Sequence, residues 1–210
     1  MGGSIARWVS EGKSVSLAVL TGHGVEAHPI WTRDRWDQVR SECLAAGEIL
    51  GISKIVFREL PAACLDNVPA WQVNRVVADL VAEISPQELY IPFEFDLHKD
   101  HAAIAYAAYV AARPYLAGAR SIRRLMAYET LSETHLWPAG FAPAFQPNVF
   151  VSIEKTLEKK LAAMSVYKSQ LHGGCSPRSL TALTALARLR GAHVGSEAAE
   201  GFMLLGEYLR

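Results

Sequence analysis

The sequence predicts an α/β fold with a mostly parallel sheet flanked by helices. Short apolar segments alternate with longer segments of helical periodicity, as is typical of parallel strands joined by covering helices. The chain of 210 residues is 50% hydrophobic and 20% charged, so it can bury a sizeable core. No internal repeat, low-complexity tract or charge block interrupts the alternation. We therefore predict one α/β domain over residues 1–210.

In the first half of the chain, helix caps and turn residues set the limits of the expected elements. Thr32 fits the N-cap of a long helix, and Gly51 fits its end. Pro86 stops the next helix, because the residue before a proline disfavours helical geometry. In order, we expect a strand at 14–21, a helix at 32–51, a strand at 54–57 and a helix at 71–84.

The second half continues this alternation with less regular spacing. Gly173-Gly174 is expected to break one helix, and Pro177 lies near the first turn of the next. The signals at 201–209 are mixed, so we leave their state open. In order, we expect a strand at 88–92, a helix at 102–112, a strand at 121–130, a loop at 131–148, a helix with a stripe from Leu157 to Leu171, and a helix carrying Leu180, Leu183 and Leu186.

The run Asp96-Leu97-His98-Lys99-Asp100-His101 places two imidazoles and two carboxylates after an expected strand. Open α/β sheets build their sites where the carboxyl ends of their strands meet. His98 and His101 are three residues apart, so they share one face if the helix has begun at His98. They can then reach one metal ion or one substrate atom. The same run also suits a polar helix cap with solvated histidines, and spacing alone does not choose between the two interpretations.

Motifs along nearly the whole chain favour the functional interpretation. The run Asp96-x-His98-x-Asp100-His101 resembles the second metal motif of the PIG-L/LmbE-like zinc-dependent de-N-acetylase family. Several ordered motifs are stronger evidence than one. The later segments that follow the family pattern are Tyr128-Glu129, Pro147 to Val151, Thr156 to Lys160, Tyr167 to Gln170, Pro177-Arg178-Ser179, Ala187-Arg188, Arg190-Gly191, Gly195, and Ala199-Glu200 before Phe202.

The resemblance implies a Rossmann-like sheet whose first central strand is missing here. The family opens with a strand and an Ala-His-Pro-Asp-Asp-Glu loop that carries two zinc ligands and the general base, and this sequence contains no His-Pro-Asp-Asp. Met1-Gly2-Gly3-Ser4 looks like the helix start that follows that loop. Either the start is an internal methionine, or the chain is a truncated or degenerate member. His101 is the one family zinc ligand that remains, where three are usual. Replacement ligands could come from His23, His28 or Asp96, although a histidine after a strand in a Gly-containing turn is more often simply solvated.

The resemblance also implies a role for each residue of the run. His101 would ligate Zn²⁺, which polarises the acetamide carbonyl and lowers the pKa of its bound water. His98, as imidazolium, would stabilise the oxyanion or assist the departing amine. Asp100 would fix the tautomer and orientation of His98 through a hydrogen bond. The catalytic pair is then His98 and Asp100, the metal ligand is His101, and the further Zn²⁺ ligands are expected in the missing N-terminal loop.

Three further residues are expected to bind the substrate or orient the motif. Asp96 precedes His98 by two residues and is a candidate for orienting the run. Glu129 and Arg178 match family positions that face the pocket or hold its wall. For Glu129, a surface charge at a strand end is the alternative. For Arg178, an ion pair with Glu197 or Glu200 is the favoured interpretation.

The implied reaction is zinc-dependent hydrolysis of an N-acetyl group from an N-acetylglucosamine-containing conjugate. The alternative is a non-catalytic family member that binds sugars or interacts with proteins. An unrelated α/β hydrolase is a weaker third interpretation, because no Gly-x-Ser-x-Gly elbow or phosphate loop occurs.

Composition limits the partners of this protein. The 21 basic and 21 acidic side chains give a formal net charge of zero, so no long-range field recruits nucleic acid or an anionic membrane. No apolar run approaches the length of a membrane span. Cys43, Cys64 and Cys175 form no metal-binding spacing and are typical of reduced thiols. We expect a cytoplasmic protein with a small amino-sugar partner and leave homo-oligomerisation open.

Overall fold

The computed structural model describes residues 1–24 and 28–210. Contacts divide the chain into two compact units, Met1–Pro61 with Phe150–Glu200, and Ala62–Val149 with Gly201–Arg210. The expectation of one domain over the whole chain stays a prediction. Among the described residues, no helix combines the length and the apolar character that crossing a membrane requires.

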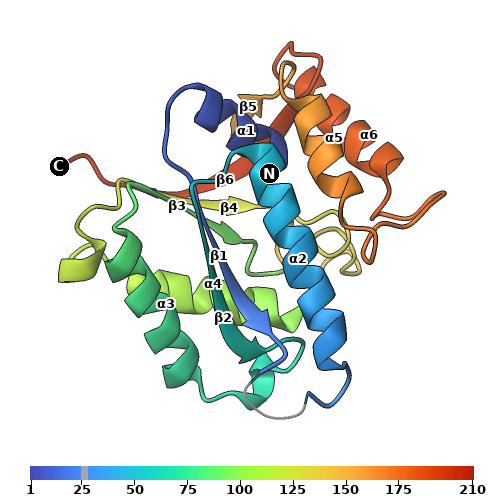
Figure 1. The fold of residues 1–210 in the computed structure, drawn as a ribbon. Coiled ribbons are helices and arrows are strands. Elements are labelled where there is room, and N and C mark those ends of the chain that lie inside the picture. Colours follow the sequence, from blue (N-terminus) through green and yellow to red (C-terminus); the bar gives the residue numbers. More distant parts are fainter. Residues whose placement is uncertain (25–27) are drawn as a thin grey trace. The chain divides into compact units, whose positions relative to one another are not determined.

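The elements alternate along the chain as the sequence predicts, and the α/β fold class is confirmed (Figure 1). The unit limits fall within β5 and β6. The first unit contains α1 (Gly2–Ser10), β1 (Ser16–Gly22), α2 (Arg33–Leu50), β2 (Lys54–Pro61), most of β5 (Val149–Ser152), α5 (Leu157–Ser165) and α6 (Leu180–Ala192). The second contains η1 (Leu65–Asn67), α3 (Ala70–Ile84), β3 (Glu88–Pro92), α4 (Lys99–Ala111), η2 (Ala117–Ala119), β4 (Arg124–Tyr128) and most of β6 (Ala199–Glu207).

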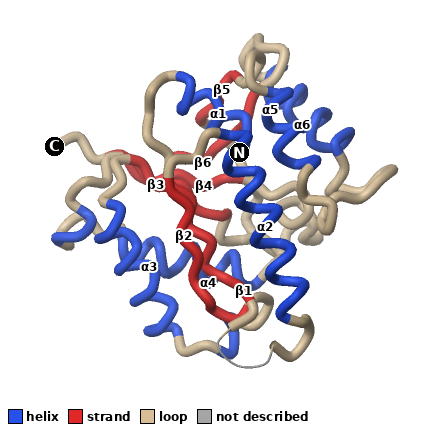
Figure 2. Tube along the Cα trace, in the orientation of Figure 1, coloured by secondary structure: helices blue, strands red, loops and turns tan. Residues whose placement is uncertain are grey.

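The strands form two sheets, coloured red in Figure 2. In one, β1 and β2 are parallel. The other has the strand order β3-β4-β6-β5. Here β3 is parallel to β4, with Pro92 opposite Tyr128, whereas β6 is antiparallel to β4. The expected mostly parallel sheet is therefore mixed, and the segment that we left open is β6.

The expected absence of a first central strand stays a prediction. Among residues 1–24 and 28–210, β1 and β3 each have a strand partner along one edge only. Backbone groups at an unpaired strand edge must bond to water or to another chain.

The helix limits show which sequence signals were reliable. Thr32 is the N-cap of α2, although its side chain makes no capping hydrogen bond, and Gly51 is the C-cap in the left-handed region at φ 77°. Gly51 also approaches α1, because an added Cβ would lie 2.8 Å from Val9 Cγ1. The predicted stripe to Leu171 was too long, since α5 ends at Ser165. The N-cap of α6 is Ser179, whose Oγ accepts from the Ala182 N–H.

A buried carboxylate holds the first turn of α1 in the first unit. Glu200 accepts hydrogen bonds from Gly3 N–H at 3.2 Å and Ser4 N–H at 2.8 Å, and Lys160 Nζ lies 2.7 Å from its Oε1. A helix N-terminus favours negative charge. Burial alone would raise the pKa of Glu200, but Lys160 and the N-terminal ammonium outweigh burial and lower this pKa well below its usual range.

We expect Glu200→Gln to lower the free energy of unfolding by about 3–5 kcal/mol, because the variant leaves Lys160 buried without its counter-charge. A carboxyl whose pKa is lower in the folded chain than in the unfolded chain stabilises the fold above the unfolded value, and that contribution is lost as the pH falls. Urea denaturation should therefore show wild-type stability falling below pH 4.5, the ordinary glutamate value, and a smaller fall in the variant.

Glu197→Gln is the matched control, because Glu197 is exposed and three residues away in sequence. An equal loss of stability in the two variants would contradict the role given to the buried carboxylate.

Candidate functional site

The candidate site lies in the second unit, where the parallel strands β3 and β4 end side by side at Pro92 and Tyr128. After β3 the chain turns at buried Phe93, and the Asp96 N–H donates to the Phe93 carbonyl at 3.2 Å. Helix α4 begins at Lys99, three residues earlier than the sequence predicted. The run of acids and imidazoles therefore joins the end of a strand to the first turn of a helix.

A buried carboxylate orients the predicted metal ligand. Asp96 Oδ2 lies 2.6 Å from Nδ1 of His101, and the Asp96 side chain is 0% exposed while that of His101 is 24% exposed. A carboxylate only accepts hydrogen bonds, so Nδ1 carries the proton and the lone pair of neutral His101 is at Nε2. This carboxylate–histidine pair is the usual support of a metal ligand. Asp96 Oδ2 is therefore engaged by His101, and the use of Asp96 as a replacement ligand stays a prediction.

His98 has the opposite tautomer from its neighbour. It is the N-cap of α4, and its Nδ1 accepts from the Asp100 N–H at 3.2 Å. The His98 and His101 rings are stacked, with centroids 5.0 Å apart and planes 18° apart, so the expected shared face is confirmed. Because its Nδ1 is an acceptor, neutral His98 carries its proton on Nε2. A full imidazolium, the role that the resemblance implies for His98, would lose this capping bond.

The carboxylate of Asp100 fixes a neighbouring loop. Its Oδ2 accepts from Ala63 N–H at 2.6 Å and its Oδ1 from Leu65 N–H at 3.1 Å. Ala63 has φ 57°, in the region that favours glycine, so these bonds hold a strained turn. Asp100 therefore orients His98 through its backbone N–H, while its carboxylate bonds elsewhere. The cap interpretation is right in part, because His98 caps α4, and the role of the run in binding a metal ion or a substrate stays a prediction.

The two other expected substrate-binding residues lie in different units. Glu129 follows β4 in the second unit, where its Oε2 lies 2.8 Å from His135 Nε2. Arg178 lies in the first unit, and its Nη1 donates to Gln170 Oε1 at 3.0 Å. Glu200 pairs with Lys160, and the favoured ion pair of Arg178 stays a prediction.

Sequence reasoning assigned no role to Tyr128, the last residue of β4, or to His135 in the loop that follows. Burial, and to a smaller extent the Asp96 charge, raise the pKa of Tyr128 to about 12, so its phenol keeps its proton at neutral pH. His135 lies in the loop that was expected at 131–148. A histidine six residues after Glu129 is too weak a signal to find from the sequence alone.

These side chains suit a metal ion only in part. His101 fits, because its neighbour fixes the lone pair at Nε2. Within residues 1–24 and 28–210, however, no group of three or more His, Cys, Asp or Glu side chains is arranged to hold one ion. The described residues therefore do not complete a three-ligand zinc site. His23 and His28 belong to the first unit, where Nδ1 of His28 accepts from Ile30 N–H, and their use as replacement ligands stays a prediction.

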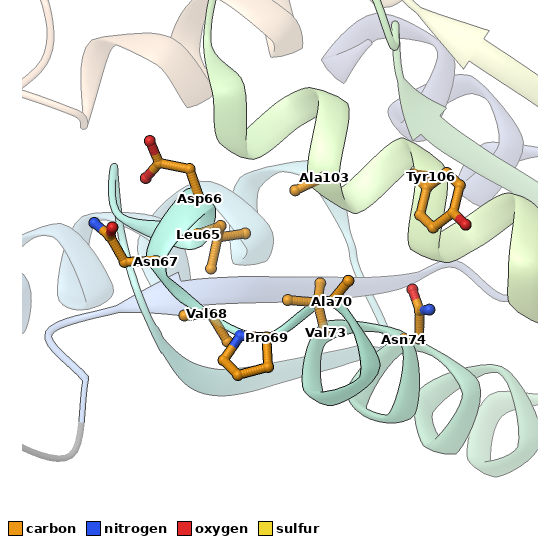
Figure 3. Close-up of a pocket in the computed structure, with 10 residues that line it drawn as sticks. All are labelled: Leu65, Asp66, Asn67, Val68, Pro69, Ala70, Val73, Asn74, Ala103 and Tyr106. Atoms are coloured by element: carbon orange, nitrogen blue, oxygen red, sulfur yellow. The ribbon is translucent and has the colours of Figure 1, made fainter.

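A cavity of about 510 Å³ lies between η1, the start of α3 and α4 (Figure 3). Ala103 and Tyr106 of α4 line it together with Leu65 of η1. His101 precedes Ala103 by two residues, which is about 200° around a helix. The cavity and the imidazoles are therefore on different faces of α4, and we do not assign the cavity to the site.

Three solved structures resemble the whole chain. The conserved protein TT1542 from Thermus thermophilus is 27% identical, with a TM-score of 0.74 over 100% of this chain and 89% of that one. N,N′-diacetylchitobiose deacetylase from Pyrococcus horikoshii is 17% identical, with a TM-score of 0.72 over 98% of this chain and 78% of that one. GalB, the 4-carboxy-2-hydroxymuconate hydratase from Pseudomonas putida KT2440, is 19% identical, with a TM-score of 0.73 over 100% and 91%.

The last two likenesses show the fold alone, and one fold can serve different reactions. The family comparison is more specific. The family model described as PIG-L, GlcNAc-PI de-N-acetylase, matches residues 1–112, a segment that ends just after α4 and so includes the stacked imidazoles. This match supports a de-N-acetylase kind of function, a hydrolase acting on amides. The chain belongs to the PIG-L family.

Proposed function

We propose that this protein removes the N-acetyl group from an N-acetylglucosamine-containing conjugate, releasing acetate and a free amine. The observation that carries the proposal is the Asp96–His101 hydrogen bond beside the stacked ring of His98. It leaves one imidazole with a lone pair and its neighbour with an N–H, at the carboxyl ends of two parallel strands.

The proposal includes Zn²⁺ as the cofactor and His101 as its ligand through Nε2. Bound zinc would supply a Lewis acid and a water of lowered pKa. Asp96 keeps Nδ1 protonated, which directs the lone pair to Nε2. Further ligands are needed, because one imidazole does not hold zinc tightly.

His98 is proposed to stabilise negative charge on the substrate. Its Nε2–H is a fixed donor, because the Asp100 N–H occupies Nδ1 and the ring is stacked on His101. A preorganised donor stabilises an oxyanion without the cost of reorientation. This neutral-donor role replaces the imidazolium that the resemblance implied. Asp100 serves catalysis by holding the capping geometry.

We propose that three further residues contact the substrate or orient the residues of the site, namely Glu129, Arg178 and Asp96. A small amino-sugar conjugate remains the proposed partner. A cytoplasmic location and a homo-oligomeric state stay predictions.

A non-catalytic sugar-binding member would bind the same ligand and release no acetate, so an acetate-release assay separates the two functions.

We expect His101→Ala to abolish both zinc retention and acetate release, because the variant removes the oriented ligand. Elemental analysis and an enzymatic acetate assay on N,N′-diacetylchitobiose measure the two effects. His193→Ala is the matched control, since His193 is exposed at the end of α6. Full activity in His101→Ala would rule out the proposed mechanism.

For His98→Ala we expect retained zinc and a kcat lower by about a hundredfold, the usual loss when one oxyanion donor is removed. The helix remains because the cap is a single hydrogen bond, worth about 1 kcal/mol. Loss of zinc in this variant would instead make His98 a metal ligand.

Asp96→Asn should weaken zinc binding about 10–100-fold without unfolding the chain, because the amide no longer fixes the tautomer of His101. Competition with a chromogenic chelator measures the affinity, and circular dichroism checks the fold. An affinity equal to that of the wild type would show that the buried carboxylate does not tune the ligand.

A further inference from the structure

A second carboxylate–imidazole pair follows β4. Glu129 Oε2 lies 2.8 Å from His135 Nε2, and their side chains are 6% and 39% exposed. A largely buried carboxylate thus hydrogen-bonds to a more exposed imidazole, as Asp96 does to His101 after β3. Nothing in the family's metal motif accounts for this second pair.

A hydrogen-bonded turn brings His135 back to Glu129. The N–H groups of Glu133 and Thr134 both donate to the Thr130 carbonyl at 2.8 Å, and Thr134 Oγ1 accepts from Thr130 N–H at 2.7 Å. The Phe145 ring lies edge-on to the His135 ring, with centroids 6.4 Å apart. The imidazole is therefore held by the turn, by a carboxylate and by an aromatic ring.

The loops that carry the two pairs contact each other. Pro92 and Tyr128, the last residues of β3 and β4, are opposite each other, and neighbouring strands are about 4.8 Å apart. The Leu97 N–H, between Asp96 and His98, donates to the carbonyl of Glu133 at 3.3 Å. Phe145 also packs edge-on against Phe93, which precedes Asp96. Both loops therefore belong to one edge of the sheet.

The chemistry of His135 follows from its partner. A carboxylate only accepts hydrogen bonds, so Nε2 of His135 carries a proton. Nδ1 is then the ring nitrogen that can take up or release a second proton. Among the described residues, Nδ1 of His135 has no hydrogen-bond partner. We propose that His135, held by Glu129, is the general acid that protonates the departing amine. This inference rests on the proposed deacetylase function and deepens it.

The step balances without another reactant. As the C–N bond of the tetrahedral intermediate breaks, its electron pair moves to nitrogen, and nitrogen takes the proton from Nδ1 of protonated His135. The products are a free amine and acetic acid, and His135 becomes neutral. The proton removed from the attacking water restores Nδ1. His98 does not serve in this step, because its Nδ1 already accepts from Asp100 N–H.

The test compares two leaving groups with the full chain supplied with Zn²⁺. N,N′-diacetylchitobiose releases a basic amine that needs a proton, whereas 4-nitroacetanilide releases a weakly basic amine that needs little help. We expect His135→Gln to lower kcat about a hundredfold or more on the first substrate and less than about threefold on the second, with KM unchanged. Glu129→Gln should show the same selective loss at smaller magnitude, because Glu129 acts through His135.

The control is His193→Gln, which should leave both rates unchanged. Equal losses on the two substrates, or no loss on either, would overturn the role of His135 while leaving the deacetylase function intact. If the wild-type chain with Zn²⁺ released acetate from neither substrate, the proposed function would fail, and this inference with it.

Discussion

The hydrogen bond between Asp96 and His101 is the interaction on which the site depends. The Asp96 side chain has no exposed surface, and its Oδ2 bonds to the imidazole at 2.6 Å, whereas its Oδ1 is buried without a hydrogen-bond partner among the described residues. The bond to His101 is therefore the one hydrogen bond that offsets the cost of burying this carboxylate. This bond fixes the tautomer of His101 and so decides which nitrogen can bind a ligand. The stacked ring of His98 is fixed in the opposite sense by the first turn of α4. Two like residues, three apart in sequence, thereby acquire different chemistry.

The arrangement of the backbone brings the loops that carry these side chains together. Because β3 and β4 are parallel, their carboxyl ends meet, and the loops that follow them lie together. Asp100 adds a second constraint, since its carboxylate accepts from two N–H groups of the Ala63 to Leu65 turn while its own N–H donates to His98 Nδ1. A change at Asp100 would therefore disturb both the turn and the orientation of an imidazole. The carboxylates of this run therefore have structural roles in addition to the functional roles proposed for them.

The sequence predicted those parts of the molecule that depend on local patterns. Strand β3 has the predicted bounds, Glu88 to Pro92, and Gly51 ends α2 because the left-handed C-cap favours glycine. Long-range contacts were not readable. The buried partner of Glu200 is Lys160, 40 positions earlier in the chain, and the antiparallel pairing of β6 with β4 has no local signature. The run from Asp96 to His101 was found, but the tautomers of its histidines depend on hydrogen bonds that spacing does not show.

The state of the His101 ring tests this account most directly. Long-range ¹H–¹⁵N NMR on the full chain, with the resonance assigned by His101→Ala, reports which ring nitrogen carries the proton. The account predicts a proton on Nδ1 and a lone pair on Nε2 at neutral pH, with the Nε2 resonance shifting when Zn²⁺ is added. A proton on Nε2, or a mixture of tautomers that Asp96→Asn leaves unchanged, would contradict it.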